Sequence, residues 1–283
     1  MVRIVTDSTC DIPFEIARKL SITIVPLHIQ IGGETYRDSI DLTTDRVCHE
    51  LVHSHEIPKT STPSPGDFVT VYNKLAAETD YIISIHLSPG YSGTYSVAKL
   101  ASGYIGDKCH VEVIDSNLVS VGLGLAVMAA ARAAQKGNDL HQIIDVIHQT
   151  IPRIHLFGKI DNFAYILRGR RFRLTRLLTL LGRVSMALGI KMLGEVYDGG
   201  KIRSPAYVIG QAMALKQLQR WAKSIPNVKE IAIAYSTAPE EAEMLAKRLE
   251  HLVSRENILI TRLGCATSTY VGPGTSVMAL TEG

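Results

Sequence analysis

The sequence predicts an α/β protein in which mostly parallel sheets are covered by helices. Short apolar runs rich in Val and Ile alternate with longer amphipathic stretches, which is the pattern of strand–helix–strand units. Polar turns carrying Ser, Thr, Asp and Gly follow several of the apolar runs. Apolar residues make up 46% of the 283 residues, which is ample for a buried core. Chain length and pattern together predict two α/β domains.

The elements of the first half alternate along the chain. We predict strands over residues 2–6, 22–31, 81–87 and 110–114. We predict helices over residues 13–19, 42–55, from 65 onward, 94–104, 120–136 and 140–150. In a parallel sheet the carboxyl ends of the strands meet at one edge, so the polar turns that follow these strands should line that edge.

The pattern changes after Pro152, and we place the domain boundary between residues 155 and 156. The N-terminal domain is therefore 1–155 and the C-terminal domain 156–283. In the second domain we predict strands over residues 154–159, 189–197, 231–235, 258–261 and 276–280, and helices over 209–223 and 239–252. Asp198, Gly199 and Gly200 mark a turn after one strand, and residues 270–275 read as a tight turn before the last.

Charge and composition exclude several classes of protein. A formal charge of +3 and a pI near 8.6 are too mild for a nucleic-acid-binding domain. The longest apolar run, residues 121–131, is too short for a membrane span and reads as a buried helix. No Walker or G-x-G-x-x-G motif predicts a nucleotide cofactor. Scattered cysteines predict neither disulfides nor a zinc site, which fits a cytoplasmic protein: Cys10, Cys48, Cys109 and Cys265.

The first candidate site is the turn that joins the strand at 81–87 to the helix at 94–104. Ser92, Gly93 and Thr94 supply hydroxyls and free backbone N–H groups at a helix N-terminus, which is a common place for an anion. Ser92 could also simply cap the helix. A hydrolase nucleophile is disfavoured, because glycine follows Ser92 directly and the G-x-S-x-G elbow is absent. His86, the nearest base, reads as a core residue of the strand.

The second candidate site is the segment from Thr60 to Asp67, where Thr60 and Ser61 precede a predicted helix. Ser64 is its predicted N-cap, with Asp67 in the capping-box position. Two hydroxyl-rich turns in one domain suggest a single shared anionic ligand.

Other polar groups have structural interpretations that we prefer. Asp7 and Asp115 end predicted strands, where carboxylates more often cap helices than bind metal. The dense arginines from Arg168 to Arg176 could meet an anionic surface or an acidic partner, but a solvated face is the better interpretation.

Five motifs occur in the order found in a known family. They are I-V-T-D-S-T from residue 4, K-T-S before Pro63, S-G-T-Y from residue 92, V-I-D-S from residue 113 and G-P-G from residue 272. In these motifs the chain resembles the DegV family of bacterial fatty-acid-binding proteins, over nearly its whole length. The resemblance implies a two-domain fold that holds one long-chain fatty acid in a tunnel between the domains, with no catalysis and no other cofactor.

The resemblance also implies roles for individual residues. Thr60 and Ser92 correspond to the family's carboxylate-binding threonine and serine. Both lie in the turns already identified as anion sites. A buried carboxylate needs such hydrogen bonds, because its desolvation is otherwise prohibitive.

At two positions this chain departs from the family pattern in a way that concerns a partner protein. Some family members present their acid to a dihydroxyacetone-kinase-like fatty acid kinase. Such members carry a histidine and an arginine where this chain has Tyr270 and Ile209. Tyr270 can donate a hydrogen bond but carries no charge. Both replacements remove potential positive charge near a reacting carboxylate, so we expect lipid binding to persist and kinase coupling to be weak.

We therefore expect a cytoplasmic fatty-acid-binding protein without stable membrane insertion. Two alternatives stay open at this stage: a phosphotransferase-like or serine-dependent lipid enzyme, and a scaffold subunit whose turns are purely structural.

Overall fold

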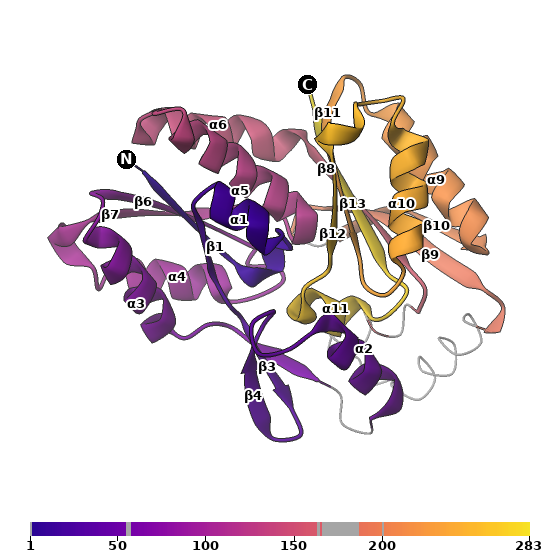
Figure 1. Cartoon of the computed structure of the whole chain (residues 1–283), viewed down its shortest axis with the longest axis horizontal. Coiled ribbons are helices and arrows are strands. Elements are labelled where there is room, and N and C mark those ends of the chain that lie inside the picture. The colour runs from indigo at the N-terminus through magenta and orange to yellow at the C-terminus, as the bar shows by residue number, and fades with distance from the viewer. Residues whose placement is uncertain (1, 55–57, 163–164, 166–186, 200) are drawn as a thin grey trace.

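A computed structural model describes residues 2–54, 58–162, 165, 187–199 and 201–283. The arginine cluster from Arg168 to Arg176 lies outside these residues. The described chain forms three sheets with helices around and between them (Figure 1).

The first sheet is parallel, as the strand–helix alternation predicts. Its strand order is β2 (Ile22–Val25), β1 (Arg3–Asp7), β6 (Tyr81–His86) and β7 (His110–Asp115). One face packs on α3 (Pro65–Ala76) and α4 (Thr94–Ser102). The other face packs on α1 (Phe14–Lys19), α5 (Ser120–Gln135) and α6 (Leu140–Thr150). The helix predicted over 140–150 has these bounds.

A small antiparallel sheet is formed by the segment between β2 and β6 of the first sheet. Its order is β4 (Glu34–Arg37), β3 (His28–Ile31) and β5 (Lys59–Ser61), and α2 (Thr44–His53) packs beside it. The single strand predicted over 22–31 is therefore wrong. The chain breaks at Pro26, which has no N–H to donate to a ladder, and the two halves join different sheets.

The third sheet has six strands and is mixed. Its order is β10 (Lys201–Ile209), β9 (Ile190–Tyr197), β8 (Ile154–Ile160), β13 (Ser276–Glu282), β11 (Val228–Tyr235) and β12 (Ile258–Arg262). Only β11 and β12 pair in parallel here, so the expected parallel order holds in the first sheet and not in this one. The short turn at Asp198 and Gly199 explains part of the difference, because a turn of that length can join only antiparallel strands.

Helices α9 (Gln211–Ser224) and α10 (Pro239–Leu249) cover one face of the third sheet. On the other face lies α5, which also contacts the first sheet, so one apolar core extends across both (Figure 1). Gly124 allows α5 to pack closely on the segment that follows β1, because a Cβ there would lie 2.6 Å from the carbonyl oxygen of Cys10. The buried helix expected over 121–131 is thus confirmed.

The last helix, α11 (Cys265–Val271), packs against α2 and the small sheet rather than against its own sheet (Figure 1). Tyr270 and Val271, expected in a turn, belong to this helix, which ends at Gly272 with a φ of 76°. Among the described helices, none combines the length and hydropathy that a membrane span requires.

Candidate anion-binding site

The turn after β6 brings Ser92 to the start of α4. Ser92 Oγ accepts a hydrogen bond from the backbone N–H of Thr94 at 3.3 Å and lies 2.9 Å from Thr94 Oγ1. Gly93 holds the N-cap position of α4 and supplies no side-chain cap. The N-terminus of α4 therefore presents one half-buried hydroxyl, that of Ser92, above the buried hydroxyl of Thr94.

Thr60 lies in β5, and its hydroxyl meets that of Tyr270 at the end of α11. The distance from Thr60 Oγ1 to Tyr270 Oη is 2.6 Å, between residues 210 positions apart. Thr60 faces α11 because it stands opposite the buried Ile29 in the ladder between β3 and β5. Tyr270 is 45% exposed, so this hydroxyl pair can be reached from solvent.

Ser61 lies on the opposite face of β5 from Thr60, because successive strand residues alternate. It stands opposite His28, whose Nε2 lies 3.9 Å from Asp67 Oδ2 at the start of α3. Sequence reasoning did not identify His28. The predicted capping box at Ser64 and Asp67 is present with both of its hydrogen bonds.

The two turns are neighbours. A Cβ placed on Gly93 would lie 3.7 Å from Thr62 Cγ2, which is ordinary van der Waals contact. Thr62 follows Thr60 and Ser61 directly, so the Ser92 turn and the Thr60 strand share a surface. The structure thus places Thr60 with Tyr270, and Ser92 with Gly93 and Thr94, on adjoining segments.

A buried series of hydrogen-bonded side chains lies at the end of β6, where the turn to Ser92 begins. Asp7 Oδ2 lies 2.9 Å from His86 Nδ1 and accepts a hydrogen bond from the N–H of Leu87 at 3.1 Å. Ser84 Oγ lies 2.7 Å from His86 Nε2 and accepts a hydrogen bond from Tyr72. His86 is fully buried with both ring nitrogens occupied, which confirms its interpretation as a core residue.

One of the two strand-end carboxylates has the helix-capping role expected of it. Asp7 is the N-cap of the short 3-10 helix Ser8–Cys10 and accepts a hydrogen bond from the N–H of Thr9. For Asp115 the expectation is wrong, because it accepts its hydrogen bond from the N–H of Asn117 in the turn after β7, and the next helix, α5, has Val119 as its N-cap. Within the described residues, no group of three or more His, Cys, Asp or Glu side chains could hold a metal ion.

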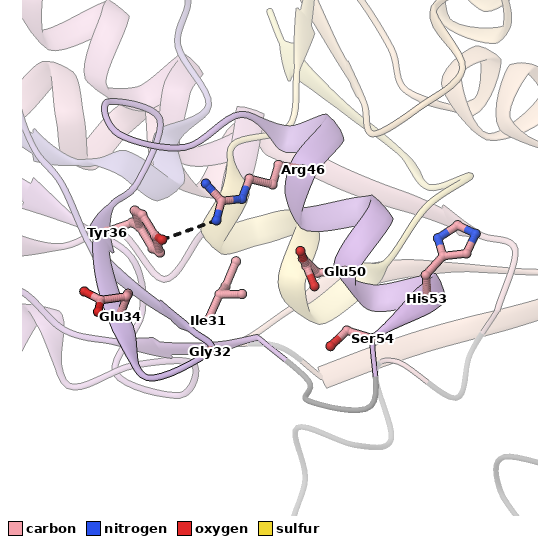
Figure 2. A pocket seen from close by; sticks show the side chains of 8 residues that line it. All are labelled: Ile31, Gly32, Glu34, Tyr36, Arg46, Glu50, His53 and Ser54. Carbon is pink, nitrogen blue, oxygen red and sulfur yellow. Dashed lines mark hydrogen bonds between the residues drawn. The ribbon is translucent and has the colours of Figure 1, made fainter.

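A separate cavity of about 550 Å³ lies between the β3–β4 hairpin and α2 (Figure 2). Arg46 extends across it toward Tyr36, donating a hydrogen bond of 3.2 Å to the phenol oxygen. Glu50 and His53 line the same cavity from α2. None of the hydroxyls described above lines this cavity, so it is distinct from the candidate anion-binding residues.

Comparison with known proteins connects this fold to one family. The family model described as "Uncharacterised protein, DegV family" matches residues 1–282. A DegV domain-containing protein from Caldanaerobacter subterraneus subsp. tengcongensis is 30% identical over 275 residues, covering 96% of this chain and 95% of the relative.

Solved structures show the same fold. One, described as "Fatty Acid Binding of a DegV family Protein from Thermus thermophilus", aligns with a TM-score of 0.83 and 25% identity over 99% of both chains. Another, described as DegV, a fatty acid binding protein from Bacillus subtilis, aligns with a TM-score of 0.82 and 25% identity over 100% of this chain and 99% of that one. The similarity therefore extends over all three sheets.

Proposed function

Because this chain belongs to the DegV family, we propose that it binds one long-chain fatty acid and holds the carboxylate with Thr60 and Ser92. One observation supports this assignment above the others. Two adjoining segments carry the hydroxyl pairs Thr60–Tyr270 and Ser92–Thr94, beside the N-terminus of α4, where Gly93 supplies no side-chain cap. Uncharged donors of this kind satisfy a carboxylate without neutralising it.

We place the acyl chain between an N-terminal unit, residues 1–155, and a C-terminal unit, residues 156–283. The Thr60 segment is contributed by the first unit and Tyr270 by the second, so a head group bound there lies where the units meet. Burying a methylene stabilises by about 0.8 kcal/mol, so a sixteen-carbon chain gains roughly 10 kcal/mol before ordering costs. Retention through purification is expected.

The protein acts as a binder rather than a catalyst in this proposal. A serine hydrolase needs a base in reach of Ser92, and the neighbouring His86 is buried with Asp7 and Ser84 as its partners. We assign the protein to the cytoplasm, a reducing compartment, because all four of its cysteines are unbridged.

The test starts from protein purified under native conditions. Solvent extraction followed by mass spectrometry should find one long-chain fatty acid per chain. Absence of a stoichiometric acid, together with failure to bind added hexadecanoate, would refute the proposed function.

Variants then test the two hydroxyls. Hydrogen bonds to a charged group are worth about 1.5–3 kcal/mol, so Thr60→Val and Ser92→Ala should each weaken hexadecanoate binding roughly tenfold or more. Hexadecanol binding should change far less. Matched controls are Thr35→Val, an exposed position in β4, and Ser102→Ala, a half-buried position at the opposite end of α4 from Ser92. Equal losses for acid and alcohol would mean that the side chains only support the fold.

A further inference from the structure

Two buried carboxylates meet the backbone where α11 begins. Asp11, 5% exposed, accepts hydrogen bonds at Oδ1 from the N–H of Gly264 at 2.8 Å and from Thr267 Oγ1 at 3.3 Å. Its Oδ2 accepts one from Ser120 Oγ at 2.6 Å. One side chain of the N-terminal unit thus holds the first turn of a helix of the C-terminal unit.

Asp38 makes the adjacent contact. It is 1% exposed, and its Oδ1 accepts hydrogen bonds from the N–H of Cys265 and from Ser39 Oγ, each at 2.9 Å. Its Oδ2 accepts one from Ser8 Oγ at 2.6 Å. We call Asp11 and Asp38, with the N–H groups of Gly264 and Cys265, the α11 clasp.

The backbone around the α11 clasp is held in an unfavourable conformation. Asp11, Ser39 and Ser120 have φ values of 50°, 59° and 55°. Left-handed residues other than glycine persist only where their surroundings over-determine them, and here all three contribute to one contact.

Close approach is a second constraint. A Cβ on Gly264 would lie 3.1 Å from Asp11 Oδ1 and 3.2 Å from Ser39 Oγ, so the approach favours glycine. The close packing around Gly264 and the buried hydrogen bonds keep these residues in their unfavourable backbone conformations, so the α11 clasp has one geometry.

The position of α11 depends on such contacts because the helix is short. At seven residues it has little stability of its own. Further ties to the N-terminal unit fix the segment leading into it: Thr44 Oγ1 donates to the carbonyl of Leu263 at 2.7 Å, and Thr261 Oγ1 donates to that of Asp11 at 3.1 Å. The same helix ends with Tyr270 beside Thr60.

We propose that Asp11 and Asp38 are positioning residues of the head-group site. By fixing the start of α11 on the N-terminal unit, they set Tyr270 Oη against Thr60 Oγ1. This inference rests on the proposed function, since its purpose is to align donors for the carboxylate.

The experiment is a double-mutant cycle with hexadecanoate and hexadecanol as probes. Asp38→Ala leaves the N–H of Cys265 without its acceptor and should weaken hexadecanoate binding about tenfold, with little change for hexadecanol. In a Tyr270→Phe background the same substitution should add almost nothing, because the two residues act through one helix. Asp38→Asn retains an acceptor oxygen and should recover most of the affinity.

The matched control is Asp115→Ala, which also removes a strand-end carboxylate but one whose hydrogen bond is to Asn117. It should leave both affinities unchanged. Full additivity of Asp38→Ala with Tyr270→Phe, or equal losses for acid and alcohol, would overturn the proposal.

A second readout needs no ligand. Hydrogen exchange of residues 265–271 should accelerate in Asp38→Ala and in the milder Gly264→Ala, while exchange in α6 stays at the wild-type rate. Unchanged exchange in α11 would also overturn the proposal. If wild-type protein fails to bind hexadecanoate while α11 exchange responds as expected, the proposed function fails and the mechanical role of the α11 clasp stands.

Discussion

Two kinds of polar residue serve different purposes in this protein. The exposed or half-buried hydroxyls of Thr60, Ser92 and Tyr270 are available to a ligand. The carboxylates of Asp11 and Asp38 are buried and fully engaged with neutral donors. Burial raises the pKa of Asp11 to about 7, although hydrogen bonds from Ser120 and Gly264 oppose the shift. Burial likewise raises the pKa of Asp38.

These raised pKa values predict an unusual pH dependence of stability. The pKa of Asp11 lies above that of an unfolded aspartate, so the folded protein binds more protons between about pH 4 and 7. The contribution of Asp11 to the free energy of unfolding therefore falls as pH rises through that window, by about 1.4 kcal/mol for each pH unit that separates the folded and unfolded pKa values. Asp11→Asn should reduce this loss, measured by urea unfolding at pH 5 and pH 8.

The control for that measurement is Asp41→Asn. Hydrogen bonds from Arg37 lower the pKa of Asp41 to about 2, so Asp41 stays ionised in both states across this range. In this variant the free energy of unfolding should differ between pH 5 and pH 8 by the same amount as in the wild-type protein. If Asp11→Asn and the wild-type protein lose the same free energy of unfolding between pH 5 and pH 8, the pH dependence does not come from Asp11.

At the level of secondary-structure elements, the β9–β10 hairpin contacts the turn that carries Ser92, which the sequence patterns did not predict. A Cβ on Gly90 would lie 2.3 Å from the carbonyl oxygen of Gly199, so the hairpin tip packs backbone to backbone on the turn that carries Ser92. Gly199 has a φ of 67°, and a Cβ there would lie 2.8 Å from Ser88 Oγ. The Ser92 turn and Thr60 are thus each in contact with an element of the C-terminal unit.

Gly199→Ala should separate steric fit from backbone strain when compared with Gly137→Ala, in the turn that ends α5. Both glycines have positive φ, but a Cβ on Gly137 would meet no atom within 4 Å. Left-handed alanine costs about 1–2 kcal/mol in either variant, and overpacking adds about 1–3 kcal/mol at Gly199 alone. We expect lower stability and weaker hexadecanoate binding in Gly199→Ala, measured by denaturation and titration. Equal effects of the two substitutions would argue against a role for the hairpin tip.

The hairpin also bears on the position of Ile209. Ile209 ends β10 and is 71% exposed, whereas the tip at the other end of that strand reaches the Ser92 turn. The strand pairings put Ile209 at the same end of the third sheet as Ser276, which follows α11 and Tyr270. That Ile209 lies near a bound carboxylate stays a prediction.

For the whole molecule, α5 joins the two larger sheets into one core, so the units are held together by packing as well as by the α11 clasp. A bound acid would have its head group at a site built from both units. Phosphorylation of such an acid by a kinase would depend on the charge presented at this site, because phosphoryl transfer develops negative charge.

We predict feeble acyl phosphate formation when acid-loaded protein is mixed with a fatty acid kinase from its own host and ATP. Tyr270→His should raise the rate, because an imidazolium can place positive charge beside Thr60. The double variant Tyr270→His with Ile209→Arg should raise it further, because it puts positively charged side chains at both positions. Wild-type turnover comparable to that of a histidine-bearing relative would contradict the prediction.

The local features of this protein could be predicted from its sequence. The capping box at Ser64 and Asp67, the helix Leu140–Thr150 and the turn from His86 to Thr94 are specified by neighbouring residues, through side-chain caps and hydrophobic periodicity. These signals suffice to predict the α/β order of the first sheet and the Ser92 turn. The turn expected at Thr60 and Ser61 is wrong, because both residues belong to strand β5 and pair with β3.

Long-range contacts were decided only by the tertiary structure. Strand register put Ser61 on the opposite face from Thr60, and a strand break at Pro26 created the small sheet that carries Thr60. Tyr270 reaches Thr60 because α11 packs on α2 and the small sheet, with Asp11 and Asp38 holding its first turn. Such pairings depend on shape and on buried hydrogen bonds between segments more than 200 residues apart, which no local propensity encodes.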